Sequence, residues 1–253
     1  MKQAMIFAAG LGTRLRPLTD TMPKALVRVG GEPLLHRIIM KLKAAGFERI
    51  VVNVHHFAEQ ITNYLKANDN FGLDIRISDE SDTLLDTGGG IRKAAPLFDP
   101  SSPILIHNVD ILSNVDLADF YTKAADNDAT LLVSQRATSR YLVFNNDMQL
   151  EGWVNIKTGE TKGQCPTPSS LLDPHSSLLP PPSSLGLAFS GIHVISPRLF
   201  PLMEQWPEKF GIIDFYLDAC QKANIRGWLK TDLRLLDVGK IDTLREAEMF
   251  ICP

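Results

Sequence analysis

Near its beginning the chain carries the stretch Q-A-M-I-F-A-A-G-L-G-T-R-L-R-P-L-T, residues 3 to 19. Its first six residues form an apolar run that glycines follow directly, a pattern typical of a buried parallel strand that ends in a loop. Gly10 and Gly12 leave the backbone of this loop bare, so that its amides can approach a triphosphate. Arg14 and Lys24 add fixed positive charge, so the stretch predicts a phosphate-binding turn.

Two familiar glycine motifs do not fit this turn. The dinucleotide-binding fingerprint requires glycine or alanine at its sixth position, where this chain has Leu15. A P-loop requires Gly-Lys-Ser or Gly-Lys-Thr, and neither triplet occurs in the sequence. The dehydrogenase reading is therefore disfavoured. Taken alone, the turn is also explained as ordinary loop punctuation.

Strands and helices alternate downstream of the turn. Apolar residues at helical spacing predict amphipathic helices, and short β-branched runs between them predict buried strands. In such sheets ligands bind beyond the carboxyl ends of the strands, where Asn108 and Asp110 lie together with the polar segment Asn53 to His56. Repeated strand–helix–strand units predict an α/β fold with a mainly parallel sheet covered by helices. The helices are expected over 33–46, 57–67 and 88–95, and the strands over 3–8, 49–54, 73–77 and 104–106.

In the second half of the chain the predicted elements are shorter, and more of them are strands. Strands over 141–144 and 153–156, joined by a turn at Asn145-Asn146, predict a small hairpin insertion. Residues 163–186 hold six Pro and six Ser, and the triplet Ser-Ser-Leu recurs there at a spacing of seven residues. Prolines forbid a heptad helix, so we expect an extended surface loop. One domain over 1–253 is then completed by strands over 129–134, 188–195 and 225–229, and by helices over 211–222 and from Ile241.

Composition narrows the classes of function. The chain has 253 residues, of which 44% are hydrophobic and 22% charged, so fibrous and disordered classes are excluded. A net charge of −3 argues against a nucleic-acid partner. The apolar run Ala4 to Ala9 is too short for a signal peptide or a membrane span. Because Cys165, Cys220 and Cys252 form no closely spaced pair, we expect reduced thiols in a cytoplasmic protein without a membrane partner.

The residues around the turn decide between the two explanations. Ala8 to Thr19, followed by Pro23-Lys24, resembles the A-A-G-x-G-T-R-L-x-P-L-T and P-K signature of the sugar-1-phosphate nucleotidyltransferases. A match over roughly 20 residues is far more specific than a lone glycine motif. The resemblance implies a three-layer, Rossmann-like nucleotide-diphospho-sugar transferase fold, with a nucleotide-binding half over 1–135 and a sugar-binding half over 136–253. It also implies transfer of a nucleotidyl group from a nucleoside triphosphate to a sugar 1-phosphate, with release of pyrophosphate.

Further motifs extend the resemblance. Asp86 to Ile91 is similar to the family's E-T-G-G-G-I segment, which lies near the base and ribose, although Asp86 or Thr87 would also serve as the cap of a helix. His107 to Asp110 is similar to N-G-D, and Leu236 to Lys240 is similar to D-V-G-T. The resemblance implies that Asp110 and Asp237 hold Mg²⁺, which prefers an all-oxygen shell. Since both follow strand-like runs, one edge of the parallel sheet can bring them together.

The resemblance also implies the remaining site residues. Phe189 to Ile192 is similar to the family's F-[ST]-G-I strand, in which the glycine leaves room for the sugar. Arg14, Lys24 and Asp110 are the implied catalytic residues, and Asn108 and Gly191 are the implied sugar contacts. The implied nucleotide contacts are Ala9, Gly10, Gly12, Thr13, Arg14, Lys24, Glu80 and Gly88.

One family feature is missing from the sequence. Many relatives carry an E-K-P triplet whose lysine contacts the sugar phosphate, and none occurs between Tyr141 and Gly186. Relatives that also lack it include the uridylyltransferases of N-acetylmuramate 1-phosphate, which the N-terminal half of this chain resembles. UTP with that sugar phosphate, or with a related hexose 1-phosphate, is therefore expected. A mannose-1-phosphate guanylyltransferase and a non-catalytic sugar-nucleotide sensor are the alternatives, and a homodimer stays open.

Overall fold

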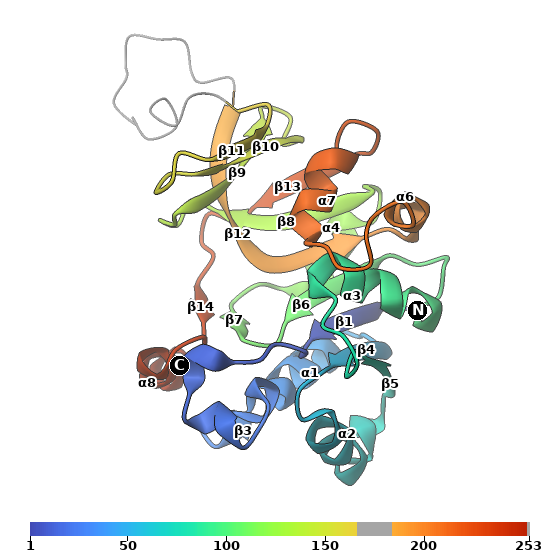
Figure 1. Ribbon diagram of the computed structural model, residues 1–253, viewed down its shortest axis with the longest axis vertical. Helices are drawn as coiled ribbons and strands as arrows, with labels where there is room; N and C mark the ends of the chain where they lie inside the picture. Colours follow the sequence, from blue (N-terminus) through green and yellow to red (C-terminus); the bar gives the residue numbers. More distant parts are fainter. Residues whose placement is uncertain (166–183, 252–253) are drawn as a thin grey trace.

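The computed structural model describes residues 1–165 and 184–251. Within these ranges ten strands form one mixed sheet with the order β11-β10-β9-β12-β6-β1-β4-β5, in which β8 pairs with β12 and with β13 (Figure 1). The predicted Pro/Ser loop over 163–186 lies largely outside the described residues. The strands of this sheet are β1 (Gln3–Phe7), β4 (Arg49–Val54), β5 (Asp74–Asp79), β6 (Ile104–Asn108), β8 (Ala129–Ser134), β9 (Arg140–Asn145), β10 (Leu150–Asn155), β11 (Thr161–Gly163), β12 (Ser184–Ile195) and β13 (Ile225–Leu229).

The run that begins the sequence becomes a central strand. β1 lies between β4 and β6 and is parallel to both, with Gln3 opposite Arg49 on one side and Ile104 on the other. Because side chains alternate along a strand, Ala4 and Ile6 enter one hydrophobic cluster and Met5 enters the other. The strand is therefore buried on both faces, which explains why it reads as a continuous apolar run.

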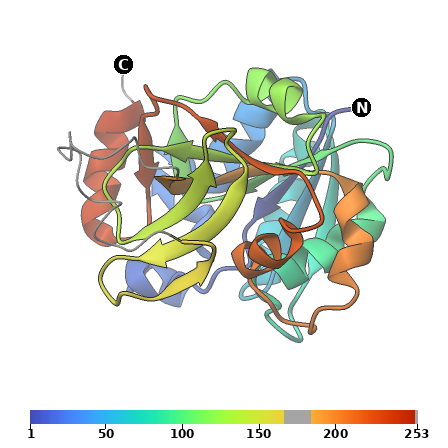
Figure 2. The same ribbon diagram turned by 90° about the horizontal axis from the view of Figure 1, so that it is seen from above.

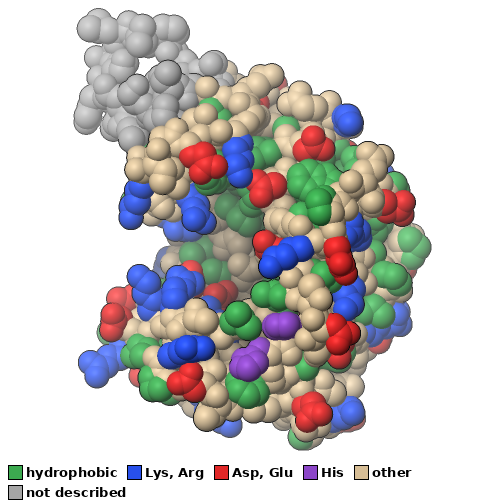
Figure 3. Space-filling view, in the orientation of Figure 1, with side chains coloured by type: hydrophobic (Ala, Val, Ile, Leu, Met, Phe, Trp, Pro, Cys, Tyr) green, Lys and Arg blue, Asp and Glu red, His purple; other side chains and the backbone are tan. Residues whose placement is uncertain are grey.

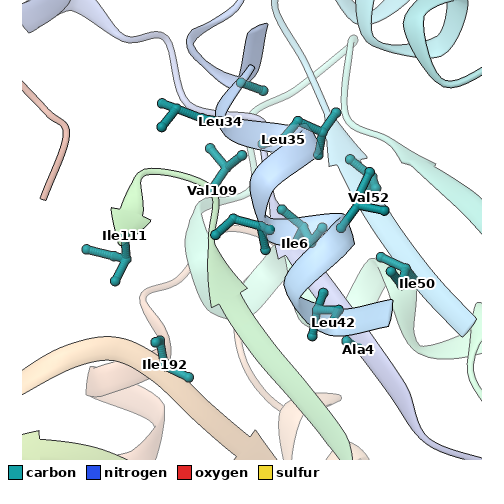
Figure 4. Packing of buried hydrophobic residues seen from close by; sticks show 14 of the residues in the cluster. Ala4, Ile6, Leu34, Leu35, Leu42, Ile50, Val52, Val109, Ile111 and Ile192 are labelled. Atoms are coloured by element: carbon teal, nitrogen blue, oxygen red, sulfur yellow. The ribbon is translucent and has the colours of Figure 1, made fainter. Parts of the chain in front are cut away.

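Helices cover both faces of the sheet. One cluster holds apolar residues of α1, α2 and α4, and Figure 4 shows Leu34, Leu35 and Leu42 of α1 packed over Ile6 and its neighbours. The other cluster holds residues of α3, α6 and α7, and Figure 2 shows α4 on one side of the strands and α6 and α7 on the other. This confirms the predicted three-layer α/β fold. The helices are α1 (Leu34–Ala44), α2 (Ala58–Ala67), α3 (Asp86–Ala94), α4 (Leu117–Ala124), α6 (Phe200–Met203), α7 (Ile212–Ala219) and α8 (Ile241–Ile251).

The strand-rich insertion stands at one end of the sheet. β9, β10 and β11 pair antiparallel, as the predicted hairpin requires, and they lie above the parallel strands in Figure 1. β12 joins them to the rest of the molecule, because Ser184 to Leu187 pair with β9 while Ile192 to Ile195 pair with β6. A single long strand therefore connects the two halves of the fold.

The short elements escaped sequence analysis. Helix α4 has only eight residues, and it is capped by Asp116, whose carboxylate accepts hydrogen bonds from the amides of Ala118 (2.9 Å) and Asp119 (3.0 Å). Two small antiparallel ribbons also form, and segments of two or three residues show no period to detect. They pair β2 (Arg28–Val29) with β3 (Glu32–Pro33), and β7 (Ile111–Ser113) with β14 (Leu235–Asp237).

The structure bears on the predicted state of the cysteines and on the prediction of no membrane span. Cys165 and Cys220 are free thiols, while Cys252 lies outside the described residues. In the described part of the chain, no helix has the length and apolar character needed to cross a membrane.

Candidate active site

A cavity of about 530 Å³ opens where the carboxyl ends of β1, β4 and β6 meet the glycine turn. Figure 3 shows the molecule hollowed on one side, with Lys and Arg side chains both above and below the hollow. The expected residues of the turn line the cavity, as do Lys24, Glu80, Asn108 and Asp110, whereas Gly88, Gly191 and Asp237 do not. The lining residues are Phe7, Ala8, Ala9, Gly10, Leu11, Gly12, Thr13, Arg14, Lys24, Asn53, Glu80, Leu84, Asp86, Thr87, Asn108, Val109, Asp110, Lys209 and Gly239.

The glycine turn presents unpaired backbone donors to this cavity. Among the described residues, the amides of Gly10 through Arg14 have no hydrogen-bond acceptor. A side chain at Gly10 would meet nothing within 4 Å, so the backbone is open there. Gly12 has φ +63°, and an added Cβ would lie 2.9 Å from Cγ2 of Thr19. Consecutive free amides beside open space form the concavity that backbone phosphate sites use.

A buried polar pair fixes the start of the turn. Asn53, on β4, accepts hydrogen bonds at its Oδ1 from the amides of Ala8 (2.7 Å) and Ala9 (3.3 Å). Its Nδ2 donates to Oε1 of Glu80 at 2.7 Å, and Oε2 of Glu80 accepts from the amide of Leu85 at 3.2 Å. Glu80 is fully buried. The sequence placed Asn53 in a polar segment at the carboxyl ends of the strands, but its hydrogen bonds to the turn and to Glu80 were not predicted.

Glu80→Gln tests this network. The substitution replaces one of the two acceptor oxygens by an NH₂ donor that faces the donor of Asn53 or of Leu85, and we expect it to cost about 1–3 kcal/mol of unfolding free energy. It should also raise the KM for the nucleotide, because Asn53 then holds Ala8 and Ala9 less firmly. Urea unfolding and steady-state kinetics measure both effects, with exposed Asp82→Asn as the control from the same loop. Equal stability of the two variants would contradict this role of Glu80.

Charged groups from distant parts of the chain meet in or beside the cavity. Lys24 begins a single 3₁₀ turn, is 8% exposed, and makes an ion pair with Oδ2 of Asp110. Asp237 ends β14 and lies opposite Ile111 of β7, and the amide of Val238 donates to the carbonyl of Asp110 at 2.8 Å. The predicted proximity of the two aspartates is present, but the expected route was wrong. Asp237 reaches Asp110 through the antiparallel β7–β14 ribbon, not along the edge of the parallel sheet.

The charged form of the Asp237 carboxyl is disfavoured in this cluster. Burial raises the pKa of the Asp237 carboxyl, and the negative charge of Asp110 raises it further. The positive charges of Lys24, Arg14 and Arg136 oppose this rise without cancelling it. In the described ranges, no group of three or more His, Cys, Asp or Glu side chains is placed to hold a metal ion. Two carboxylates therefore suit a hard cation such as Mg²⁺ only if other oxygen ligands come from substrates and water.

Gly88 makes room for the side chain of Phe210. A Cβ at this position would clash with the ring of Phe210, and the Gly88 amide donates to the Phe210 carbonyl at 2.9 Å. The expected helix cap also differs, because Oδ1 of Asp86 accepts only from the adjacent amide of Thr87 (2.6 Å). The Thr87 hydroxyl instead accepts from the amide of Ile212 at 2.9 Å. The start of α3 is thus bound to Phe210 and to Ile212, the first residue of α7.

Gly191 makes room for Asn108. Its φ is +78°, and an added Cβ would lie 2.6 Å from Nδ2 of Asn108. The pairing of β12 with β8 shifts register between Phe189 and His193, so Gly191 lies at a β-bulge. The missing side chain therefore leaves space that the Asn108 amide occupies at the cavity wall.

Lys209 is a lining residue that sequence analysis did not find. It lies in the segment between α6 and α7 and brings a positive charge from the C-terminal half to the cavity. No carboxylate of the described residues lies within ion-pair distance of its ammonium group. No motif surrounds it, so only the folded chain could identify it.

Comparison with known proteins assigns the chain to a protein family. Residues 3–149, more than half of its length, match the model of the nucleotidyl transferase family. The chain belongs to this family. An N-acetylmuramate alpha-1-phosphate uridylyltransferase of Neisseria meningitidis serogroup B is 34% identical over 246 residues, which cover 97% of this chain and 96% of that protein. A protein of the same name from Caulobacter vibrioides is 48% identical over 111 residues, 43% of this chain and 46% of that protein.

A solved structure agrees with this nucleotidyl transferase fold. UDP-glucose pyrophosphorylase from Acinetobacter baumanii superposes with a TM-score of 0.76 at 17% identity, covering 99% of this chain and 93% of that one. Likeness at this level of identity concerns the fold alone. It confirms the expected nucleotide-diphospho-sugar transferase architecture.

Proposed function

We propose that this nucleotidyl transferase moves the uridylyl group of UTP to N-acetylmuramate α-1-phosphate, giving UDP-N-acetylmuramate and pyrophosphate. The observation that carries the reaction class is the run of unpaired amides from Gly10 to Arg14 beside Lys24, Asp110 and Asp237. The choice of base and sugar rests on the relative that matches over nearly its whole length. In this proposal residues 1–135 bind the nucleotide, residues 136–253 bind the sugar, and the cytoplasmic enzyme makes a cell-wall precursor.

The reaction needs no protein nucleophile. An oxygen of the sugar phosphate attacks the α-phosphorus of UTP and forms the new P–O bond. The bond between the α-phosphorus and the bridging oxygen breaks, and pyrophosphate leaves with that electron pair. Such transfers are accelerated by aligning the two anions and by stabilising the charge that develops on the leaving oxygens. The site must therefore supply donors and positive charge in fixed places.

The residues of the cavity divide this task. The amides of Gly10 to Thr13 and the Arg14 guanidinium hold the β- and γ-phosphates, which become the leaving group. Lys24 contacts the α-phosphate or the incoming phosphate, and Asn108 lies on the sugar side. Asp110 and Asp237 would hold Mg²⁺, which would neutralise negative charge on the phosphate groups.

Arg14→Ala is expected to lower kcat/KM for UTP by about ten- to a hundredfold, because one charged donor to the leaving group is lost. Arg16→Ala is the matched control, since Arg16 is exposed, makes an ion pair with Asp20 at 3.2 Å, and does not line the cavity. Steady-state kinetics of pyrophosphate release measure both variants. Identical kinetics for the two would remove Arg14 from the leaving-group role.

A substrate panel tests the proposed function. Initial rates of pyrophosphate release are measured for UTP, GTP, dTTP and CTP, each with the 1-phosphates of N-acetylmuramate, N-acetylglucosamine, glucose and mannose. We expect UTP with N-acetylmuramate α-1-phosphate to give the highest kcat/KM. A preference for GTP with mannose 1-phosphate would replace the proposal with the guanylyltransferase alternative. Nucleotide binding without turnover of any pair would support a non-catalytic sensor.

A further inference from the structure

A second cavity, of about 520 Å³, lies in the C-terminal half. Its walls come from the end of β8, the β9–β11 hairpins, β12 and α7, and they include Arg136, Arg140 and Phe189. Phe189 precedes Gly191 by two residues on β12, and Gly191 packs on Asn108 of the first cavity. The second cavity is therefore placed beside the reaction site, on the side where the sugar is expected.

The charges in this cavity are not balanced. Lys162 is neutralised by Asp214 at 2.8 Å and by Glu160 at 3.9 Å. Arg136 donates from its Nη2 to the Phe189 carbonyl at 2.9 Å. This acceptor is neutral, so it orients the guanidinium without neutralising its positive charge. The guanidinium of Arg140 has no hydrogen bond or ion pair with any described residue. The three cations and two carboxylates of the wall leave a net charge of +1, and neither guanidinium makes an ion pair with a described residue.

The rest of the wall is apolar. Leu142, Trp153, Phe189, Ile213 and Leu217 line the cavity beside the two arginines. An aromatic and aliphatic surface next to unneutralised guanidinium groups fits a ligand group that carries a carboxylate and a small apolar part. A sugar that presents only hydroxyl groups here would bring no negative charge to either guanidinium group.

We infer that Arg136 and Arg140 bind a carboxylate substituent on the sugar, and that this cavity selects acidic sugar 1-phosphates. The inference rests on the proposed function and adds the residues that decide the sugar. The lactyl ether of N-acetylmuramate, with its methyl and carboxylate groups, has the required chemistry. Arg136 is the oriented member of the pair, and Arg140 is free to close on the carboxylate.

Arg140→Gln tests the inference against Lys157→Gln. Lys157 is an exposed cation of the same hairpin region that does not line the cavity. Each variant is assayed with UTP and either N-acetylmuramate α-1-phosphate or N-acetylglucosamine α-1-phosphate, which lacks only the lactyl group. We expect Arg140→Gln to lower kcat/KM for the acidic sugar by about ten- to a hundredfold, and to change the neutral sugar by less than about twofold. Lys157→Gln should change neither.

Calorimetric binding of both sugar phosphates, with a non-hydrolysable UTP analogue present, supplies a readout that does not need turnover. Selective loss of affinity for the acidic sugar in Arg140→Gln supports the inference. Equal loss for both sugars, or no loss, overturns it. Wild-type turnover that favours neutral sugars also overturns it, while uridylyl transfer itself stands. Absence of turnover with selective binding instead contradicts the proposed function and keeps the carboxylate site.

Discussion

Asp110→Asn is expected to lower kcat by about a hundredfold or more, the size of effect seen when one preorganised electrostatic group is removed from a site. The amide keeps the shape of the side chain but removes the negative charge that pairs with Lys24 and that, with Asp237, is proposed to hold Mg²⁺. The carboxylate is only partly buried, with 19% of the side chain exposed, so the fold should survive. Rates at saturating substrates and thermal unfolding measure the two effects separately.

The control for this variant is Asp126→Asn, which changes an exposed carboxylate that does not line the cavity. Asp237→Asn should lose activity in the same manner, because Asp237 reaches Asp110 through the β7–β14 ribbon. If a folded Asp110→Asn protein turned over at the rate of the control, Asp110 would not be a metal carboxylate and the site would be misplaced.

Acidification is expected to destabilise the protein because two histidines are fully buried. Burial lowers the pKa of His193 to about 3 and the pKa of His107 to about 4, whereas both groups titrate near 6.5 in an unfolded chain. Below pH 6.5 the unfolded state therefore binds more protons than the folded state. Their stabilising contribution is complete above pH 6.5. It is lost progressively as the pH falls from 6.5 to about 4 for His107 and to about 3 for His193. At about 1.4 kcal/mol per pKa unit, each histidine accounts for a few kcal/mol.

His193→Leu should remove a large part of this acid sensitivity. Neither ring nitrogen of His193 has a hydrogen-bond partner among the described residues, so an apolar replacement sacrifices no bond. The variant should lose less unfolding free energy than wild type between about pH 6.5 and pH 4.5 in urea titrations. His36→Gln, a change at a half-buried ring, serves as the control. A slope equal to that of wild type would show that His193 is not protonated on unfolding.

Local patterns carried much of the fold. The sequence pattern of three elements predicts both their type and their burial. These are the apolar run of β1, the helical spacing of apolar residues in α1 and the β-branched run of β4. The family signature then indicated Arg14, Lys24 and Asp110, and the fold brings these residues to one cavity. Each of these features is encoded within a few adjacent residues, which is why the sequence alone was sufficient.

The remaining features of the fold and the site depend on contacts between residues far apart in the sequence. No residue near Gly88 in the sequence predicts its contact with Phe210. The Phe210 ring lies where a side chain at position 88 would be, and the Phe210 carbonyl accepts a hydrogen bond from the Gly88 amide. Gly191 and Asn108 likewise meet only because β12 pairs with β6. Asn53 and Glu80 act through a tertiary hydrogen bond, and Lys209 enters the cavity from an irregular segment. Such contacts depend on strand order and register, which no local pattern contains.

The central claim is direct uridylyl transfer to a sugar phosphate, and mass spectrometry of a single reaction tests it most directly. The protein is incubated with UTP, N-acetylmuramate α-1-phosphate and Mg²⁺, and the nucleotide products and pyrophosphate are quantified over time. We predict UDP-N-acetylmuramate and pyrophosphate in equal amounts, with neither product formed when the sugar phosphate is omitted. Pyrophosphate or UMP released without a matching nucleotide sugar would contradict the account.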